Sequence, residues 1–226
     1  MRLRLAAIPA AVIVVIVGLA SAPAHANHSW GSFHWARTGP VQVTIVSSLT
    51  GGWVGNLVTA NNDWNKSPYL ENRVVAGATD TTTRRRCAMP SGGIRVCNLA
   101  YGQTGWAGLA SINTSDGRHI SRASAKMNDT YEAGRSAAEH QGVMCQEVGH
   151  DFGLAHQDEN FNNPNLGTCM DYTRNWTTNQ HPNKHDYDQL ARIYAHSDPG
   201  GRSAATPTPG ISTIRTGDTV TIITWA

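Results

Sequence analysis

The sequence predicts an α+β domain in which most strands precede the main helices. Five segments between residues 41 and 128 have the composition of strands. Residues 53–64 and 187–194 show apolar side chains at helical spacing, and a third helix is predicted to end shortly before Gly153. This pattern is typical of a sheet backed by helices. The chain of 226 residues is long enough to bury one such core.

Residues 1–26 have the pattern of a secretory signal peptide. Two arginines precede an apolar run that begins at Leu5, and residues 24–26 form a small-residue cleavage pattern. The apolar run is short and ends in Ser, Pro and Ala, which argues against a membrane span. We therefore expect a secreted, extracellular domain over residues 27–198, with no membrane span in the mature chain.

The charge balance argues against a nucleic-acid partner. The formal net charge is +2, and it includes the two arginines of the signal peptide, so the mature chain is nearly neutral. The basic run at residues 84–86 is interpreted as a solvated loop or strand edge, with a contact to an acidic partner as the alternative. No feature marks an oligomer, so we expect a monomer.

The first predicted strand has a clear alternation. Val41, Val43 and Ile45 alternate with polar residues, which indicates one buried face. A Gly-Gln-Thr-Gly turn joins the third strand to the fourth, and His119 is interpreted as a turn or strand-end residue. The other four strands are predicted at residues 73–77, 94–101, 105–112 and 119–128.

Helices are predicted from spacing and from capping residues. Trp53 and Trp64 belong to an apolar series at i, i+4, i+7 and i+11, which indicates an amphipathic helix with the tryptophans in the core. Ser136 followed by Glu139 is a capping box, so a second helix begins there. The series that begins at Tyr187 predicts a closing helix. Aromatic residues 30–35 are expected to dock the N-terminal segment onto the domain.

All four cysteines lie in the mature chain, where an oxidising compartment favours disulfides. Cys87 and Cys97 flank a turn-rich segment and are predicted to staple a hairpin-like loop. The remaining pair, Cys145 and Cys169, would join the central helix to a later turn. The alternative is a Cys145 thiolate on a metal ion, although that side chain is rotated about 100° from the other ligands.

The segment from Gln146 to His156 has the spacing of a metal site. On a helix, positions 146 and 150 share one face about 6 Å apart, so their side chains can close on one ion. Gly153 permits a left-handed turn that brings His156 back as a third ligand. Glu147 lies beside these ligands, where it can take a proton from water and pass it to a leaving amine. Three ligands with one open position are typical of catalytic zinc.

This segment resembles the active-site helix of the metzincin clan of zinc metalloendopeptidases, whose pattern is HExxHxxGxxH. A second match, residues 167–172, is similar to the clan's Met-turn and contains Met170. The resemblance implies a twisted mixed five-stranded sheet with an active-site helix, a Met-turn and a C-terminal helix. It also implies that Tyr172 binds the metal or steadies the oxyanion of the transition state.

The resemblance further implies that a strand near residues 106–111 forms the upper edge of the cleft and pairs with an extended peptide. Trp106, Gly108 and Leu109 are the candidate substrate-binding residues. The alternative is that this strand is a buried central strand of the sheet, with no free edge.

Gln146 stands where the clan has its first histidine, and its amide oxygen is a weaker and harder donor for zinc. His140 cannot replace it, because it lies ten residues before His150, about 15 Å from that ligand along the helix. The expected function is a secreted zinc-dependent endopeptidase that uses metal-activated water, with Glu147 as general base and acid. One alternative is a metal-free pseudoprotease that acts as a peptide or protein binding module. Another is a site tuned to a harder metal.

Several features lie outside this motif. Residues 157–165 are rich in oxygen donors, which allows a calcium site, although Asn and Asp are also ordinary turn formers. His181, His185 and His196 show no ligand-like spacing. The tail, residues 199–226, is predicted to be either a strand pair packed on the domain or a flexible extension.

Overall fold

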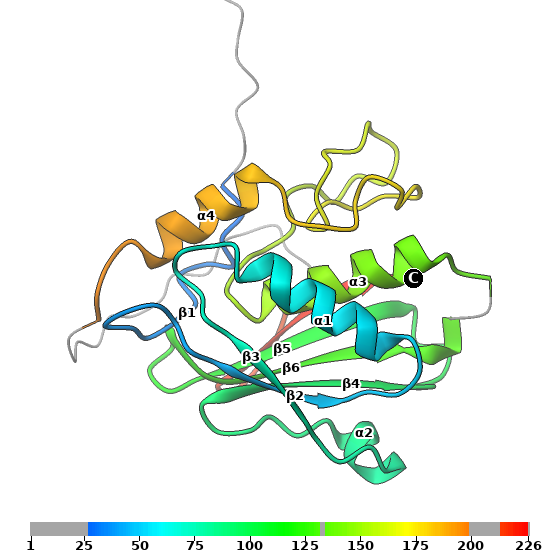
Figure 1. Cartoon of the computed structure of the whole chain (residues 1–226), viewed down its shortest axis with the longest axis horizontal. Coiled ribbons are helices and arrows are strands. Elements are labelled where there is room, and N and C mark those ends of the chain that lie inside the picture. The colour runs from blue at the N-terminus through cyan, green and yellow to red at the C-terminus, as the bar shows by residue number, and fades with distance from the viewer. Residues whose placement is uncertain (1–26, 132–133, 199–212, 226) are drawn as a thin grey trace, which may run out of the picture.

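One mixed sheet of eight strands runs through the computed structural model, which describes residues 27–131, 134–198 and 213–225 (Figure 1). The strand order is β3-β2-β4-β6-β5-β8-β7, and β1 pairs with β6 off this path. Pairs among β3, β2, β4 and β6 are parallel, whereas β5, β8 and β7 are added in antiparallel fashion. The strands are β1 (His34–Trp35), β2 (Thr44–Ser48), β3 (Arg73–Ala76), β4 (Gly93–Leu99), β5 (Trp106–Thr114), β6 (His119–Asn128), β7 (Thr213–Thr216) and β8 (Thr219–Trp225).

Two helices, α1 (Trp53–Trp64) and α3 (Ala137–His150), lie side by side along one face of the sheet (Figure 1). A third, α4 (Lys184–Tyr194), lies beyond them, and the short α2 (Thr81–Arg86) packs beside β4. A 3-10 turn, η1 (Asp129–Tyr131), follows β6. The predicted helices at 53–64, after Ser136 and around 187–194 are therefore confirmed.

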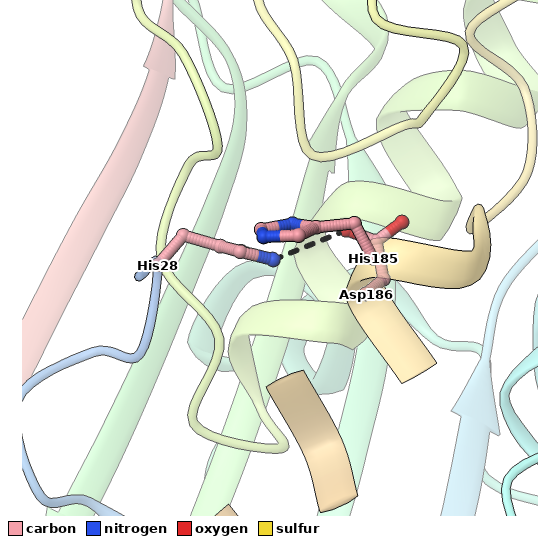
Figure 2. Close-up of side chains that lie close together, drawn as sticks. All are labelled: His28, His185 and Asp186. Atoms are coloured by element: carbon pink, nitrogen blue, oxygen red, sulfur yellow. Dashed lines mark ion pairs between the residues drawn. The ribbon is translucent and has the colours of Figure 1, made fainter. Parts of the chain in front are cut away.

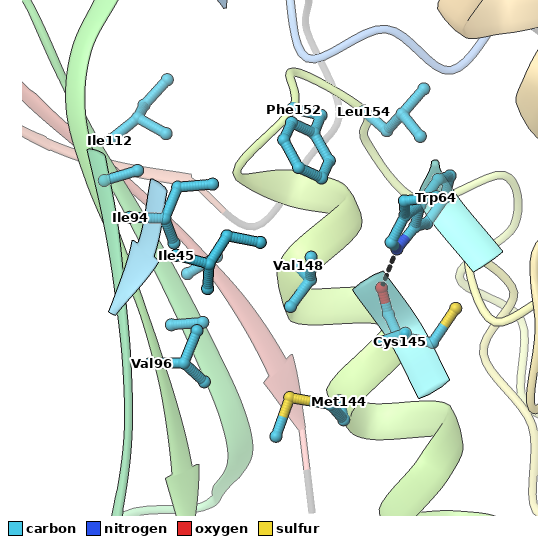
Figure 3. Packing of buried hydrophobic residues seen from close by; sticks show 14 of the residues in the cluster. Ile45, Trp64, Ile94, Val96, Ile112, Met144, Cys145, Val148, Phe152 and Leu154 are labelled. Carbon is cyan, nitrogen blue, oxygen red and sulfur yellow. Dashed lines mark hydrogen bonds between the residues drawn. The ribbon is translucent and has the colours of Figure 1, made fainter. Parts of the chain in front are cut away.

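The core lies between the sheet and α3. Ile45, Ile94 and Ile112 on three strands face Val148 and Phe152, and all five are fully buried (Figure 3). On the other side of α3, the Trp64 indole donates a hydrogen bond to the Cys145 carbonyl over 3.0 Å. Burying each large apolar side chain contributes about 1.5–3 kcal/mol to stability. The helix that carries the candidate site is therefore held on both sides.

The prediction of a mixed sheet backed by helices is confirmed, but the sheet has eight strands in the described residues rather than the five predicted. The short β1 and the tail strands β7 and β8 account for the difference. The tail prediction is thus resolved as a strand pair for residues 213–225, while residues 199–212 lie outside the described residues. The strands predicted at 94–101 and 105–112 both form, yet β6 lies between them, so the turn that joins them closes no hairpin.

The basic run belongs to a helix, so the loop or strand-edge interpretation is wrong. Asp80 caps α2 by accepting a hydrogen bond from the Thr83 amide at 3.0 Å. Arg84 then binds the Asn98 carbonyl at 2.9 Å, which ties α2 to β4. Arg85 and Arg86 remain exposed at the end of α2.

Both predicted disulfides are confirmed, between Cys87 and Cys97 and between Cys145 and Cys169. Two disulfides fit an extracellular protein. The second bond also rules out the alternative of a free Cys145 thiolate on a metal. Within the described residues, no helix is both long and apolar enough to cross a membrane. The predicted signal peptide, residues 1–26, lies outside the described residues.

Candidate functional site

Helix α3 begins at a cap and ends in the candidate site. Ser136 accepts a hydrogen bond from the Glu139 amide at 3.1 Å, while the Glu139 carboxylate binds Arg135 instead of completing the capping box. In its last turns, α3 carries Gln146, Glu147 and His150, all of which are fully buried. Three polar side chains at a buried helix end require partners, because uncompensated burial costs free energy.

A glycine turn returns the chain from α3 toward the site. Gly153 has φ +87°, its amide donates to the His150 carbonyl at 2.9 Å, and the Leu154 amide donates to the Gly149 carbonyl at 3.3 Å. These two bonds form a Schellman motif, which needs a left-handed residue at this position. The turn places His156 next to His150, as the spacing predicts.

The two imidazoles face each other through one nitrogen each. Nε2 of His150 lies 3.0 Å from Nε2 of His156. The Nδ1 atom of His150 contacts the Leu154 carbonyl at 2.9 Å, and that of His156 contacts a Glu159 carboxylate oxygen at 2.8 Å. Both acceptors require a proton on Nδ1, so both Nε2 atoms present lone pairs. Hydrogen bonds of this kind, made by the ring nitrogen that does not bind metal, orient metal-binding histidines.

The electrostatics of the site follow from its burial. Burial lowers the pKa of both His150 and His156, so both imidazoles are neutral. Burial raises the pKa of Glu147 to about 8, although the nearby Thr224 hydroxyl opposes this shift. Neither Glu147 oxygen has a well-aligned hydrogen bond within the described residues. Gly108 leaves the space for this carboxyl group, since a side chain at that position would collide with it.

The remaining predicted site residues contact the last strand or the underlying core. Gln146 Oε1 accepts a hydrogen bond from the Thr224 hydroxyl at 2.9 Å, and the Tyr172 hydroxyl donates to the Ile223 carbonyl at 2.7 Å. The Tyr172 ring lies 4.4 Å from that of His156. Met170 is fully buried beneath α3, where Gly149 leaves room for its sulfur.

The predicted substrate strand has no free edge, so the edge interpretation is wrong for this structure and the central-strand alternative holds. Strand β8 pairs with β5, opposing Trp106 with Trp225, Gly108 with Thr224 and Leu109 with Ile223. The position beside β5 that the resemblance assigns to a peptide is therefore occupied by the chain's own strand β8, which also contacts Tyr172. The substrate-binding role of these β5 residues stays a prediction.

The oxygen-rich segment after His156 forms turns. Asp158 accepts a hydrogen bond from the Asn160 amide at 2.5 Å, and Asn160 accepts one from the Asn162 amide at 3.0 Å. These are Asx turns, which agrees with the interpretation of Asn and Asp in this segment as ordinary turn formers. Calcium binding there remains a prediction.

Sequence spacing missed two groups of side chains that could hold a metal ion. In the first, Nε2 of His28 lies 3.3 Å from Oδ1 of Asp186, and the His185 ring stacks on His28 with centroids 4.9 Å apart (Figure 2). Burial lowers the pKa of His28 to about 4 and raises that of Asp186 to about 6. The other Asp186 oxygen binds Thr168 and the Asn183 amide, so this group joins the N-terminal segment to α4.

The second group contains His34, His119 and Asp198, with His196 beside them. Its members come from β1, from the start of β6 and from the segment after α4. No local spacing could reveal a group assembled from such distant segments. The only sequence hint is the His-x-Asp pair at residues 196–198.

No protein-family model matches this chain, and comparison with curated proteins gives no match.

Proposed function

We propose that this protein is a secreted zinc-dependent endopeptidase whose site is formed by the end of α3 and the turn after it. His150 and His156 would hold the metal, with Gln146 as the third and weaker ligand. The observation that carries the proposal is the pair of Nε2 lone pairs facing each other at 3.0 Å in a buried site. Two neutral imidazoles in that arrangement repel unless a cation or proton lies between them.

Zinc in this position would supply Lewis acidity that polarises a peptide carbonyl and lowers the pKa of water. The chain's own residues would transfer the protons and stabilise the oxyanion. The ionised form of Glu147 would take the proton of the attacking water and pass it to the leaving amine. A cation held by the neighbouring ligands would favour this form, because it opposes the burial that raises the pKa of Glu147. Tyr172 would donate its hydroxyl hydrogen to the developing oxyanion, as it now donates to the Ile223 carbonyl.

The contacts of β8 support a closed form of the same site. Its backbone pairs with β5 along the strand proposed for substrate, and the Ile223 carbonyl receives the hydrogen bond proposed for the reacting carbonyl. The Thr224 hydroxyl engages Gln146 Oε1, the atom that would bind metal. We propose that β8 occupies the position of an extended peptide and must leave before a substrate enters.

One observation favours the alternative of a metal-free binding module. Gln146 Oε1 already has a hydrogen-bond donor in Thr224, so its role is explained without an ion. A module of this kind would bind peptides by exchanging β8 for another strand. The binding module gives the buried Glu147 no role, which is why we place this alternative second.

Elemental analysis of the secreted chain, purified without added metal, tests the proposal. A His156→Ala variant is prepared in the same way and should hold one zinc fewer per chain. A Glu147→Gln variant should keep its zinc but lose hydrolysis of an unfolded protein by at least about 100-fold, because it lacks the proton acceptor. Chelation should abolish hydrolysis by the parent chain.

A Gln146→His variant provides the matched control for the weak ligand. Imidazole is the better zinc donor, so this variant should bind zinc more tightly than the parent. Equal zinc content in the parent and the His156→Ala variant, with zinc gained only when residue 146 is histidine, would overturn the proposal and favour the binding module.

A further inference from the structure

Four side chains from three separate segments converge at the start of β6. His34 and His119 are register partners in the parallel β1–β6 pair, so their side chains lie on the same side of the sheet. His196 and Asp198 follow the end of α4. The ring of His34 meets those of His119 and His196 edge-on, with centroids 4.8 Å and 4.9 Å apart.

The distances within this group match those among the ligands of one tetrahedral ion. Oδ1 of Asp198 lies 3.4 Å from Nε2 of His34, 3.3 Å from that of His119 and 3.1 Å from that of His196. The Nε2 atoms of His34 and His196 are 3.2 Å apart. Four ligands about 2.0–2.1 Å from a tetrahedral zinc ion lie about 3.3 Å from one another.

Outer hydrogen bonds point the lone pairs inward. Nδ1 of His34 contacts the Ser32 carbonyl at 2.8 Å, and Nδ1 of His119 contacts an Asp116 oxygen at 2.6 Å. These acceptors place the protons on Nδ1, so Nε2 of each ring faces the Asp198 oxygen as an acceptor facing an acceptor. The second Asp198 oxygen accepts from the Arg37 amide at 3.2 Å, which orients the carboxylate.

We infer that His34, His119, His196 and Asp198 bind one zinc ion, at a site separate from the end of α3. Three imidazole nitrogens and one carboxylate oxygen are a ligand set that zinc prefers. The set leaves no open position, as in structural rather than catalytic zinc sites. His196 is 37% exposed and also lines a surface hollow with His34, so an ion can reach the site from solvent.

The ion would stabilise the N-terminal segment that packs against the turn of the candidate active site. Phe33, next to His34, presses its carbonyl against Gly153 in the turn between His150 and His156. Trp35 donates its indole hydrogen to the Asp151 carbonyl at 2.8 Å. Since β1 pairs with the sheet over only two residues, a metal that ties it to β6 and to the chain after α4 would fix this support.

The competing arrangement holds the group together without metal. A proton on one imidazole would pair with Asp198, and Arg118, whose Nη2 lies 3.4 Å from Nε2 of His196, would satisfy that nitrogen. One proton cannot satisfy all three nitrogens that face the same oxygen. The two arrangements differ in their response to zinc.

The test uses the full secreted chain carrying His156→Ala, so that the α3 site contributes no zinc. After chelation and removal of the chelator, zinc is titrated back and its stoichiometry and the melting temperature are measured. We expect one zinc per chain and a rise of about 5–10 °C at a hundredfold excess over the dissociation constant. Loss of a residue that only hydrogen-bonds a metal ligand weakens metal binding by about 10- to 100-fold. In this background, His196→Ala and Asp198→Asn should each weaken zinc binding by more than that.

His181→Ala is the matched control. His181 is also a partly exposed histidine paired with an aspartate, Asp63, but it lies outside the group. It should leave zinc binding unchanged. Circular dichroism of the metal-free variants checks that each is folded, and Asp198→Asn preserves the side-chain shape if His196→Ala does not fold. No zinc bound in the His156→Ala background, or equal binding after both ligand substitutions, overturns the inference whether or not the α3 site binds metal.

Discussion

Gly153 shows how a single residue decides whether the two imidazoles meet. Its φ of +87° is one that L side chains rarely adopt, and a side chain there would collide with the Phe33 carbonyl. Gly117 has a similar φ of +80° but open space around it. The two positions therefore separate backbone strain from steric exclusion.

We expect Gly117→Ala to lower the free energy of unfolding by about 1–2 kcal/mol, the cost of a left-handed alanine. Gly153→Ala should cost about 2–5 kcal/mol, because the collision with Phe33 adds to the same strain. Chemical denaturation of both variants measures the difference. Equal losses would mean that the contact with Phe33 relaxes without cost.

The sequence predicted that His156 returns to His150, because this contact depends on local spacing. Gln146 and His150 are one helical turn apart, and Gly153 marks the turn that returns His156. Local spacing could not predict that Thr224, 78 residues away, would bind Gln146. It also could not reveal His34 and His119 as partners, since only the sheet register brings them together.

At the scale of elements, the two disulfides constrain different parts of the fold. The Cys145–Cys169 bond closes a separation of 24 residues and joins α3 to the turn that contains Met170. The Cys87–Cys97 bond closes 10 residues and joins the end of α2 to β4, away from the site. Only the first bond constrains the candidate metal ligands.

Replacing both Cys145 and Cys169 with alanine should lower the free energy of unfolding by about 3 kcal/mol, the loop-entropy value for that separation. It should also weaken zinc binding at the α3 site. Replacing both Cys87 and Cys97 should destabilise the chain by slightly less, because the loop is shorter, and should leave zinc binding unchanged. Thermal denaturation and zinc titration of the two double variants test this. Loss of zinc from both would show that global stability, not the local bond, controls metal binding.

Elements with strong local signals were predicted well, whereas the sheet edge was not. The helix at 53–64 formed as its apolar spacing indicates, and α4 begins at a capping box made by Asn183 and Asp186. The pairing of β5 was undecided from sequence, because a strand of this composition can lie at an edge or inside a sheet. Whether β5 is an edge strand depends on its pairing with β8, which is more than 100 residues further along the chain.

For the whole molecule, strand β8 covers the candidate site. Strand β8 buries Val220 and Ile222 against the domain and pairs with β5 between Trp106 and Asn113, while β7 forms the edge of the sheet. The contacts of Ile223 and Thr224 with Tyr172 and Gln146 place this strand directly over the site. Removing it would expose both the β5 edge and the buried carboxyl group of Glu147.

We expect a chain that ends at residue 198 to hydrolyse an unfolded protein at least about 10-fold faster than the full chain, because strand exchange at β5 no longer competes with β8. A synthetic peptide of residues 213–226 should inhibit the shortened chain, and a Thr224→Val, Ile223→Pro peptide should inhibit it less, since proline cannot donate to the strand ladder. Circular dichroism confirms that the shortened chain is folded. A folded, zinc-loaded short chain with unchanged activity and no response to the peptide would show that β8 is a permanent strand of the sheet. In that case the substrate would have to approach the site from another side.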